Sequence, residues 1–143
     1  DMVSKTEQYL NDLAAKMGNG SVSVGFMEGA TYPDGESVPM VAFENEFGVP
    51  SKGQPPRPFF RRMIAKESPN WAPRIARISK QTGFNGQRVL GIMGEDIKGG
   101  LQESINNFTD PPLSPVTIAR KGFSKPLIDT SHMLNSITYE VEE

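Results

Sequence analysis

The sequence predicts an α+β fold for a single domain of 143 residues. Two short segments, 21–27 and 137–142, alternate apolar and polar residues, which predicts strands of an antiparallel sheet with one wet face. Fourteen glycines and twelve prolines indicate long, shaped loops. A long central helix is predicted over 87–107 by apolar residues at steps of three or four, namely Leu90, Met93, Ile97, Leu101, Ile105 and Phe108.

The first third of the chain predicts two helices around the first strand. Residues 3–17 place their apolar side chains on one stripe, as in an N-terminal amphipathic helix. Residues 28–38 are mostly turn formers and predict an extended, mobile loop. A short helix then begins at Pro39 and closes at Gly48. Residues 38–43 are an alternative strand, because a stable isolated sheet needs three or more strands; otherwise neighbouring subunits complete the sheet.

The middle of the chain predicts a connector and three helices. Four prolines make residues 49–58 a stiff, extended connector, and residues 59–66 form a short helix. Asn70 is placed to cap the next helix, whose inward face carries Trp71, Ile75 and Ile78 and whose outward face carries Arg74, Arg77 and Gln81. Four glycines weaken the long helix by up to ~1 kcal/mol each, which is tolerable where another backbone packs closely. They are Gly91, Gly94, Gly99 and Gly100.

The last part of the chain predicts a loop, one helical turn and the second strand. Residues 109–127 contain several prolines and little periodicity, and long loops of this kind are usually functional. Asp129, Thr130 and Ser131 offer three consecutive N-caps for a helical turn. The strand that follows returns the chain to the sheet.

A basic segment stands out from the net charge of −2. Residues 52–80 contain eight basic residues and one acid, Glu67, for a net charge of +7, which leaves −9 elsewhere. A solvated helix face would explain the segment. So would electrostatic complementarity, either between copies of the chain or with a phosphate backbone. The basic residues are Lys52, Arg57, Arg61, Arg62, Lys66, Arg74, Arg77 and Lys80.

No arrangement of residues points to catalysis, a metal or a cofactor. His132 is the only histidine and there is no cysteine, so the sequence offers neither a triad nor a zinc site. Glu44 and Glu46 stand two apart on the predicted helix and point in different directions, which favours solvated surface acids. There is no phosphate-binding glycine loop and no HExxH motif. No apolar run approaches the ~20 residues of a membrane span, and no signal peptide is visible.

The run Arg57-Pro-Phe-Phe-Arg-Arg combines bases with aromatic residues. Such a run can serve as a nucleic-acid platform, but this one lacks the spacing of the common RNA- and DNA-binding strands. We favour Phe59 or Phe60 as a core anchor of its helix. The arginines are then either solvated or paired with acids, and the sequence leaves this open.

Two stretches together resemble the small neck and tail-completion (minor tail) proteins of long-tailed bacteriophages and prophages. Ala42-Phe-Glu-Asn-Glu-Phe-Gly-Val-Pro50 with Pro56-Arg-Pro-Phe-Phe-Arg61 resembles one half of the family signature. Leu113-Ser-Pro-Val-Thr-Ile118, Lys121-Gly122 and Lys125-Pro-Leu-Ile-Asp-Thr130 resemble the other half, in the same order. Ser131 departs from the glycine that is usual in the family, which affects the local turn.

The resemblance implies a non-enzymatic virion protein made in the host cytoplasm and assembled as a ring, often a hexamer, at the head–tail (neck) or tail-end junction. It implies an α+β fold with an antiparallel sheet, and contacts with tail tube or terminator and head–tail connector proteins. Channel DNA would pass nearby without specific binding, and no membrane would be involved. The alternative function is a basic-patch nucleic-acid-binding module. The expected interface residues are Glu44, Glu46, Arg57, Arg61, Arg62, Arg74, Arg77, Arg120 and Lys121.

Overall fold

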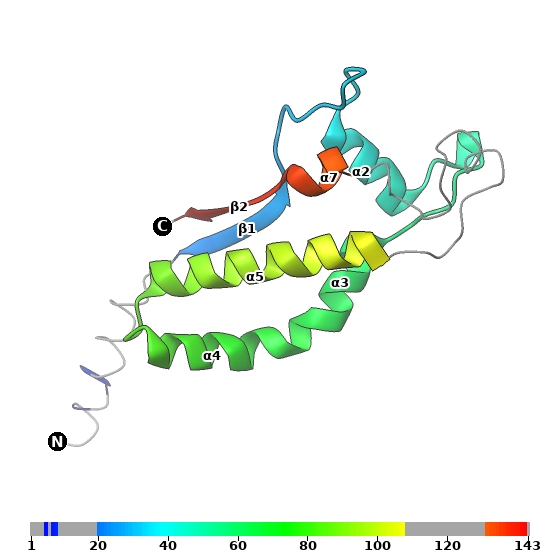
Figure 1. Ribbon diagram of the computed structural model, residues 1–143. Coiled ribbons are helices and arrows are strands. Elements are labelled where there is room, and N and C mark those ends of the chain that lie inside the picture. The colour runs from blue at the N-terminus through cyan, green and yellow to red at the C-terminus, as the bar shows by residue number, and fades with distance from the viewer. Residues whose placement is uncertain (1–4, 6, 9–19, 108–130, 143) are drawn as a thin grey trace.

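The computed structural model of the protein describes residues 5, 7–8, 20–107 and 131–142 (Figure 1). The fold is α+β with an antiparallel sheet, as predicted. Residues 5, 7 and 8 are helical, while the other residues of the predicted N-terminal helix and the whole loop at 109–127 lie outside the described part. The elements are β1 (Ser21–Phe26), α2 (Val38–Phe47), the 3-10 helix η1 (Pro50–Lys52), α3 (Phe59–Glu67), the 3-10 helix η2 (Ser68–Asn70), α4 (Trp71–Gln81), α5 (Gly86–Asn107), α7 (Ser131–Asn135) and β2 (Ile137–Glu142).

The sheet consists of β1 and β2, and α5 runs along one of its faces (Figure 1). The two strands pair in an unbroken register from Ser21 opposite Glu142 to Phe26 opposite Ile137. The predicted alternation is confirmed, because the face toward α5 is apolar and the other face is polar and largely open. The apolar face carries Val22, Val24, Phe26, Ile137, Tyr139 and Val141.

Gly94 lets α5 approach the sheet closely. A Cβ atom at this position would come within 2.5 Å of the Tyr139 ring and 2.9 Å of Val22. At Gly91 and Gly99 an added Cβ would meet open space. Close packing therefore accounts for Gly94 among the four glycines that were predicted to weaken this helix. The groups that pack against it are side chains rather than the expected backbone.

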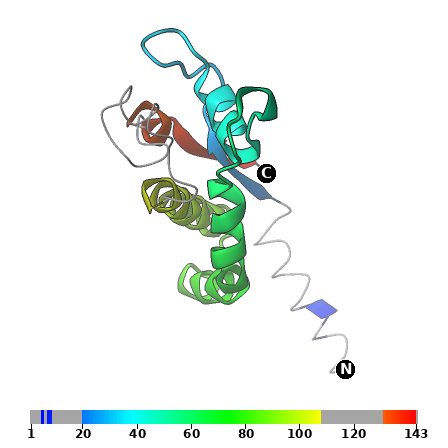
Figure 2. The same ribbon diagram turned by 90° about the vertical axis from the view of Figure 1, so that its right-hand side faces the viewer.

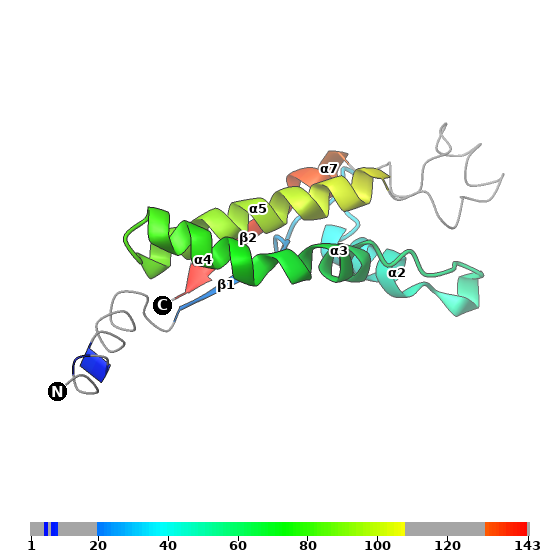
Figure 3. The same cartoon turned by 90° about the horizontal axis from the view of Figure 1, so that it is seen from below.

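The main core lies where α2, α3, α5, α7 and the sheet meet. Its largest fully buried side chains include Phe59 and Met133, and the Phe26 ring packs edge-on against Phe59 with ring centres 6.1 Å apart. This confirms Phe59 as the anchor of its helix. A second cluster of Ile78, Val89 and Met93 joins α4 to α5, which lie side by side (Figure 3).

The predicted short helix before Gly48 is confirmed, while its alternative and two other local predictions are wrong. Residues 38–43 lie in α2 and form no strand; the Ser37 hydroxyl caps this helix by accepting a hydrogen bond from the Met40 N–H. The connector at 49–58 is not extended throughout, because η1 and a bridge between Val49 and Gln54 fold it into a tight turn. Asn70 precedes α4 but makes no side-chain cap, since η2 already carries the chain in helical geometry.

Candidate interaction surface

The corner between α2 and α3 is held by a carboxylate from one helix at the start of the other. Glu46 is buried, with 6% exposed. Its carboxylate oxygens accept hydrogen bonds from the backbone N–H groups of Phe60 (2.8 Å) and Arg61 (3.2 Å). These first-turn amides have no acceptor within α3, and Pro58 before them supplies no side-chain cap. Glu46 therefore caps α3 from α2, with its charge at the positive end of the helix dipole.

Arg61 closes the same corner from the outside. Its Nε donates to the Glu46 carboxylate at 2.8 Å, and its terminal NH2 group donates to the Glu46 backbone carbonyl at 2.8 Å. The guanidinium carbon also lies 4.8 Å from the centre of the Phe47 ring, a cation–π contact. The prediction that Glu46 is a solvated acid is thus wrong. Its neighbour Glu44 is half-buried and takes no part in this cap.

Gly48 allows the chain to leave α2 in the required direction. Its φ of 75° lies in the region that favours glycine. A Cβ atom would also come within 2.8 Å of the Gln54 carbonyl oxygen and of the Pro56 nitrogen. The turn that starts here returns the chain to the end of α2, where the Arg57 N–H donates to the Asn45 carbonyl at 2.6 Å.

Arg57 lies inside the protein rather than on its surface. It is 5% exposed, and its Nε has no hydrogen-bond partner among the described residues. Burial lowers the pKa of the guanidinium below its ordinary value, because the charged form loses hydration. This burial does not support the prediction that Arg57 is an interface residue.

The outer face of α2 carries an aromatic patch, which we define as Met40, Phe43 and Phe47. These residues are 56%, 60% and 51% exposed, although all three are large and apolar. Their spacing of three and four places them on one face of the helix, and the two rings lie 4.8 Å apart. The opposite face of α2 is buried through Val38, Ala42 and Glu46.

An apolar groove adjoins the patch and separates α2 from α3. Pro39, Phe43 and Phe47 line it on the α2 side, and Phe60 and Arg61 line it on the α3 side. Phe26, at the end of β1, also lines the groove, so the sheet reaches the same surface. Exposed apolar surface with a charged rim, rich in aromatic residues, methionine and arginine, is typical of protein–protein contacts.

The basic segment is divided between internal and external roles. Arg74 was expected to face outward, but it is half-buried and pairs with Asp96 of α5 through its Nη1. Buried Arg57 and the Glu46–Arg61 pair add two more cations that act within the chain. The other five are exposed: Lys52, Arg62, Lys66, Arg77 and Lys80.

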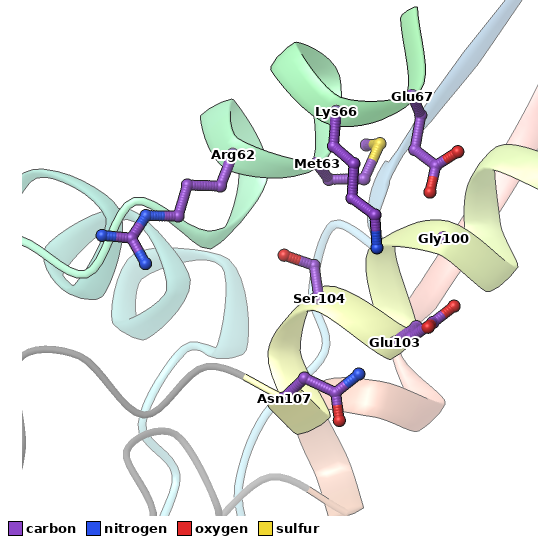
Figure 4. A pocket seen from close by; sticks show the side chains of 8 residues that line it. All are labelled: Arg62, Met63, Lys66, Glu67, Gly100, Glu103, Ser104 and Asn107. Atoms are coloured by element: carbon purple, nitrogen blue, oxygen red, sulfur yellow. The ribbon is translucent and has the colours of Figure 1, made fainter. Parts of the chain in front are cut away.

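A shallow hollow between α3 and α5 mixes charges of both signs (Figure 4). Lys66 reaches from α3 toward Gly100 and Ser104 of α5, and Arg62 extends away from the hollow. Glu67 and Glu103 also line it, so it is not a purely cationic surface.

The structure thus joins only part of the predicted interface. Glu46 and Arg61 meet at the α2–α3 corner, whereas Arg74 and Arg77 lie on α4, away from α2 (Figure 1). Arg120, Lys121 and the side chain of His132 lie outside the described part of the chain. The sequence interpretation missed the aromatic patch. Its signal was a second apolar stripe on a helix whose first stripe already faced the core.

The described residues include no group of three or more acidic or histidine side chains placed to hold a metal ion. Nor does any helix among them have the length and apolarity to cross a bilayer. Comparison of the chain with protein-family models, curated proteins and solved structures finds no match. Function is therefore inferred from this surface and from the sequence resemblance.

Proposed function

We propose that this protein is a non-enzymatic virion component of a long-tailed bacteriophage that forms a ring at the head–tail (neck) or tail-end junction and joins or completes the tail. Its partners are further copies of itself, as in a hexamer, and the adjoining tail tube, terminator or connector proteins. It is made in the host cytoplasm and ends in the virion.

The observation that carries the proposal is the exposed aromatic patch on α2. Two of its three residues, Phe43 and Phe47, lie in the stretch 42–61 that resembles the phage family, and other residues of that stretch hold the α2–α3 corner together. Glu46, Gly48 and Phe59 fix the corner, while Phe43 and Phe47 remain outside it. A fixed corner that presents aromatic side chains suits a protein whose function is assembly, because rigid aromatic anchors dominate binding energy at interfaces.

The test is to measure assembly of the wild-type protein and of Phe43→Ser. Light scattering and negative-stain electron microscopy should show rings for the wild type, alone or with tube and connector proteins, and loss of rings for the variant. Ile92→Ser is the matched control, because Ile92 is 41% exposed but lies on α5, away from the patch. A protein that stays monomeric with its partners and is missing from images of virions would overturn the proposal.

The exposed cations keep the nucleic-acid alternative open to test. Arg77 and Lys80 lie one turn apart on α4 and are both exposed. A DNA-binding module would lose affinity steeply with salt and with Arg77→Ala plus Lys80→Ala. Arg61 is unsuitable for this test, because its loss would also disturb the cap of α3. A flat salt titration excludes the alternative.

A further inference from the structure

The two-stranded sheet has a free edge on each side among the described residues. The Met27 N–H donates to the Ser136 carbonyl, which extends the β1–β2 ladder by one position. Backbone groups alternate in direction along a strand, so those of Ser23 and Gly25 also face β2. The N–H and C=O groups of Val24, and those of Tyr139 opposite it on β2, therefore point away from the ladder.

The two edges lack several of the features that usually prevent strand addition, although β2 carries Glu140 and Glu142. Neither β1 nor β2 contains proline, lysine or arginine, and their register has no bulge. β1 has no charged residue at all. Packing against α5 already supports the two strands, and strand addition at the sheet edge leaves that face in place.

The free edge of β1 leads to the aromatic patch. In Figure 2, α2 and α3 lie on the β1 side of the sheet and β2 lies on the far side; the view in Figure 3 agrees. Phe26 ends β1 and lines the apolar groove between these helices. A strand added to β1 would therefore lie beside a groove that can receive an apolar side chain, a combination that gives both affinity and specificity in strand addition.

The charges on the open face of the sheet decide which strand fits. Glu140 and Glu142 project from β2 on this face, opposite Ser23 and Ser21 of β1. Pairing of β2 with β2 of another copy would bring these glutamates toward one another, and like charges on paired strands are destabilising. Pairing of β2 with β1 of the next copy instead places each glutamate between serines on both sides.

We infer that β2 of one copy pairs antiparallel with the free edge of β1 in the next copy, so that the sheets join head to tail. This contact is heterologous, and repetition of it around an axis near the strand direction closes a ring. The order along the joined sheet is then β1, β2, β1, β2, with every neighbour antiparallel. The inference deepens the proposed function and rests on it.

Single cysteines test the contact, because the chain contains no cysteine of its own. Where the two copies join, the outward N–H and C=O groups of Tyr139 in one copy form hydrogen bonds with those of Val24 in the next copy. Glu140 of the first copy and Ser23 of the next copy are then opposite one another as a non-hydrogen-bonded pair. Such pairs have Cα atoms about 4.5 Å apart, within the range that a disulfide spans. Ser23→Cys is mixed with Glu140→Cys, and with Thr138→Cys and Glu142→Cys to scan the register, before mild oxidation. No variant can form an intrachain bond.

Head-to-tail pairing predicts a cross-linked dimer in a Ser23→Cys mixture and little dimer in either variant alone. Ser51→Cys, an exposed serine on η1, mixed with Glu140→Cys gives the background of random collisions. Dimers of Ser23→Cys alone would overturn the inference in favour of a two-fold β1–β1 contact. Rings without any cross-link above background would overturn the strand contact and leave the ring function intact. Monomers without cross-links would overturn both.

Discussion

The α2–α3 corner and the α4–α5 pair each join two helices and each contain one arginine–carboxylate pair, but they use charge differently. In the corner, the side chain of Glu46 is 8% exposed and caps a helix, while its partner Arg61 is 56% exposed. In the other pair, Arg74 and Asp96 have side chains that are 40% and 33% exposed. The Glu46–Arg61 pair fixes how two helices meet, while the Arg74–Asp96 pair lies at the rim of an apolar contact.

Apolar residues are also distributed differently in these two regions. The α4–α5 pair buries Ile78, Val89 and Met93 between its helices, as amphipathic helices normally do. The corner buries a glutamate and leaves Phe43 and Phe47 outside. The comparison indicates that aromatic side chains, more than the predicted charges, are available for a partner at the corner.

Glu46→Ala should have the largest effect on stability. It leaves two helix N–H groups without their acceptor and removes the partner of Arg61, so we expect a loss of about 2–3 kcal/mol in the free energy of unfolding. Urea denaturation followed by circular dichroism measures this loss. Glu44→Gln is the control, since a half-buried acid outside the cap should change stability by no more than ~0.5 kcal/mol. Equal effects of the two substitutions would mean that the corner does not depend on the buried carboxylate.

Gly48→Ala should rank second, at about 2 kcal/mol, because it combines an unfavourable positive φ with a backbone clash. Gly53→Ala separates these causes: Gly53 has a φ of 67° but open space around its missing Cβ. Its loss should be about 1 kcal/mol, from the backbone conformation alone. The midpoints of thermal or urea unfolding give both values. If the two variants were equally stable, the contact with Gln54 and Pro56 would have no energetic role.

The elements of the fold could be predicted from local periodicity. The alternation in β1 and β2 and the apolar steps in α5 depend on residues close in sequence, so they were found with nearly correct bounds. The role of Glu46 could not be found in this way. Its partners are 14 and 15 residues later, and they meet it only because the chain turns back after Gly48.

The aromatic patch escaped prediction for a different physical reason. Periodicity shows which residues of a helix are apolar, but the packing of other elements decides which stripe they cover. Periodicity alone cannot tell Met40, Phe43 and Phe47 from core residues, because their exposure depends on which face of α2 the other elements cover. The prediction for Arg74 failed similarly, because its acidic partner lies 22 residues away on α5.

Asp96→Asn should have the smallest effect, about 0.5 kcal/mol, because a partly exposed ion pair gains little over its hydrated groups. The loss should shrink further at 1 M salt, where the screening length is about 3 Å. A double-mutant cycle with Arg74→Ala in urea isolates the pair, and Glu95→Gln, an exposed acid on the same helix, gives the effect of removing a charge alone. A coupling energy as large as that between Glu46 and Arg61 would remove the contrast between the two regions. A weak, salt-sensitive coupling would confirm that burial, rather than the arginine–carboxylate chemistry, makes the corner the rigid part that presents the aromatic patch.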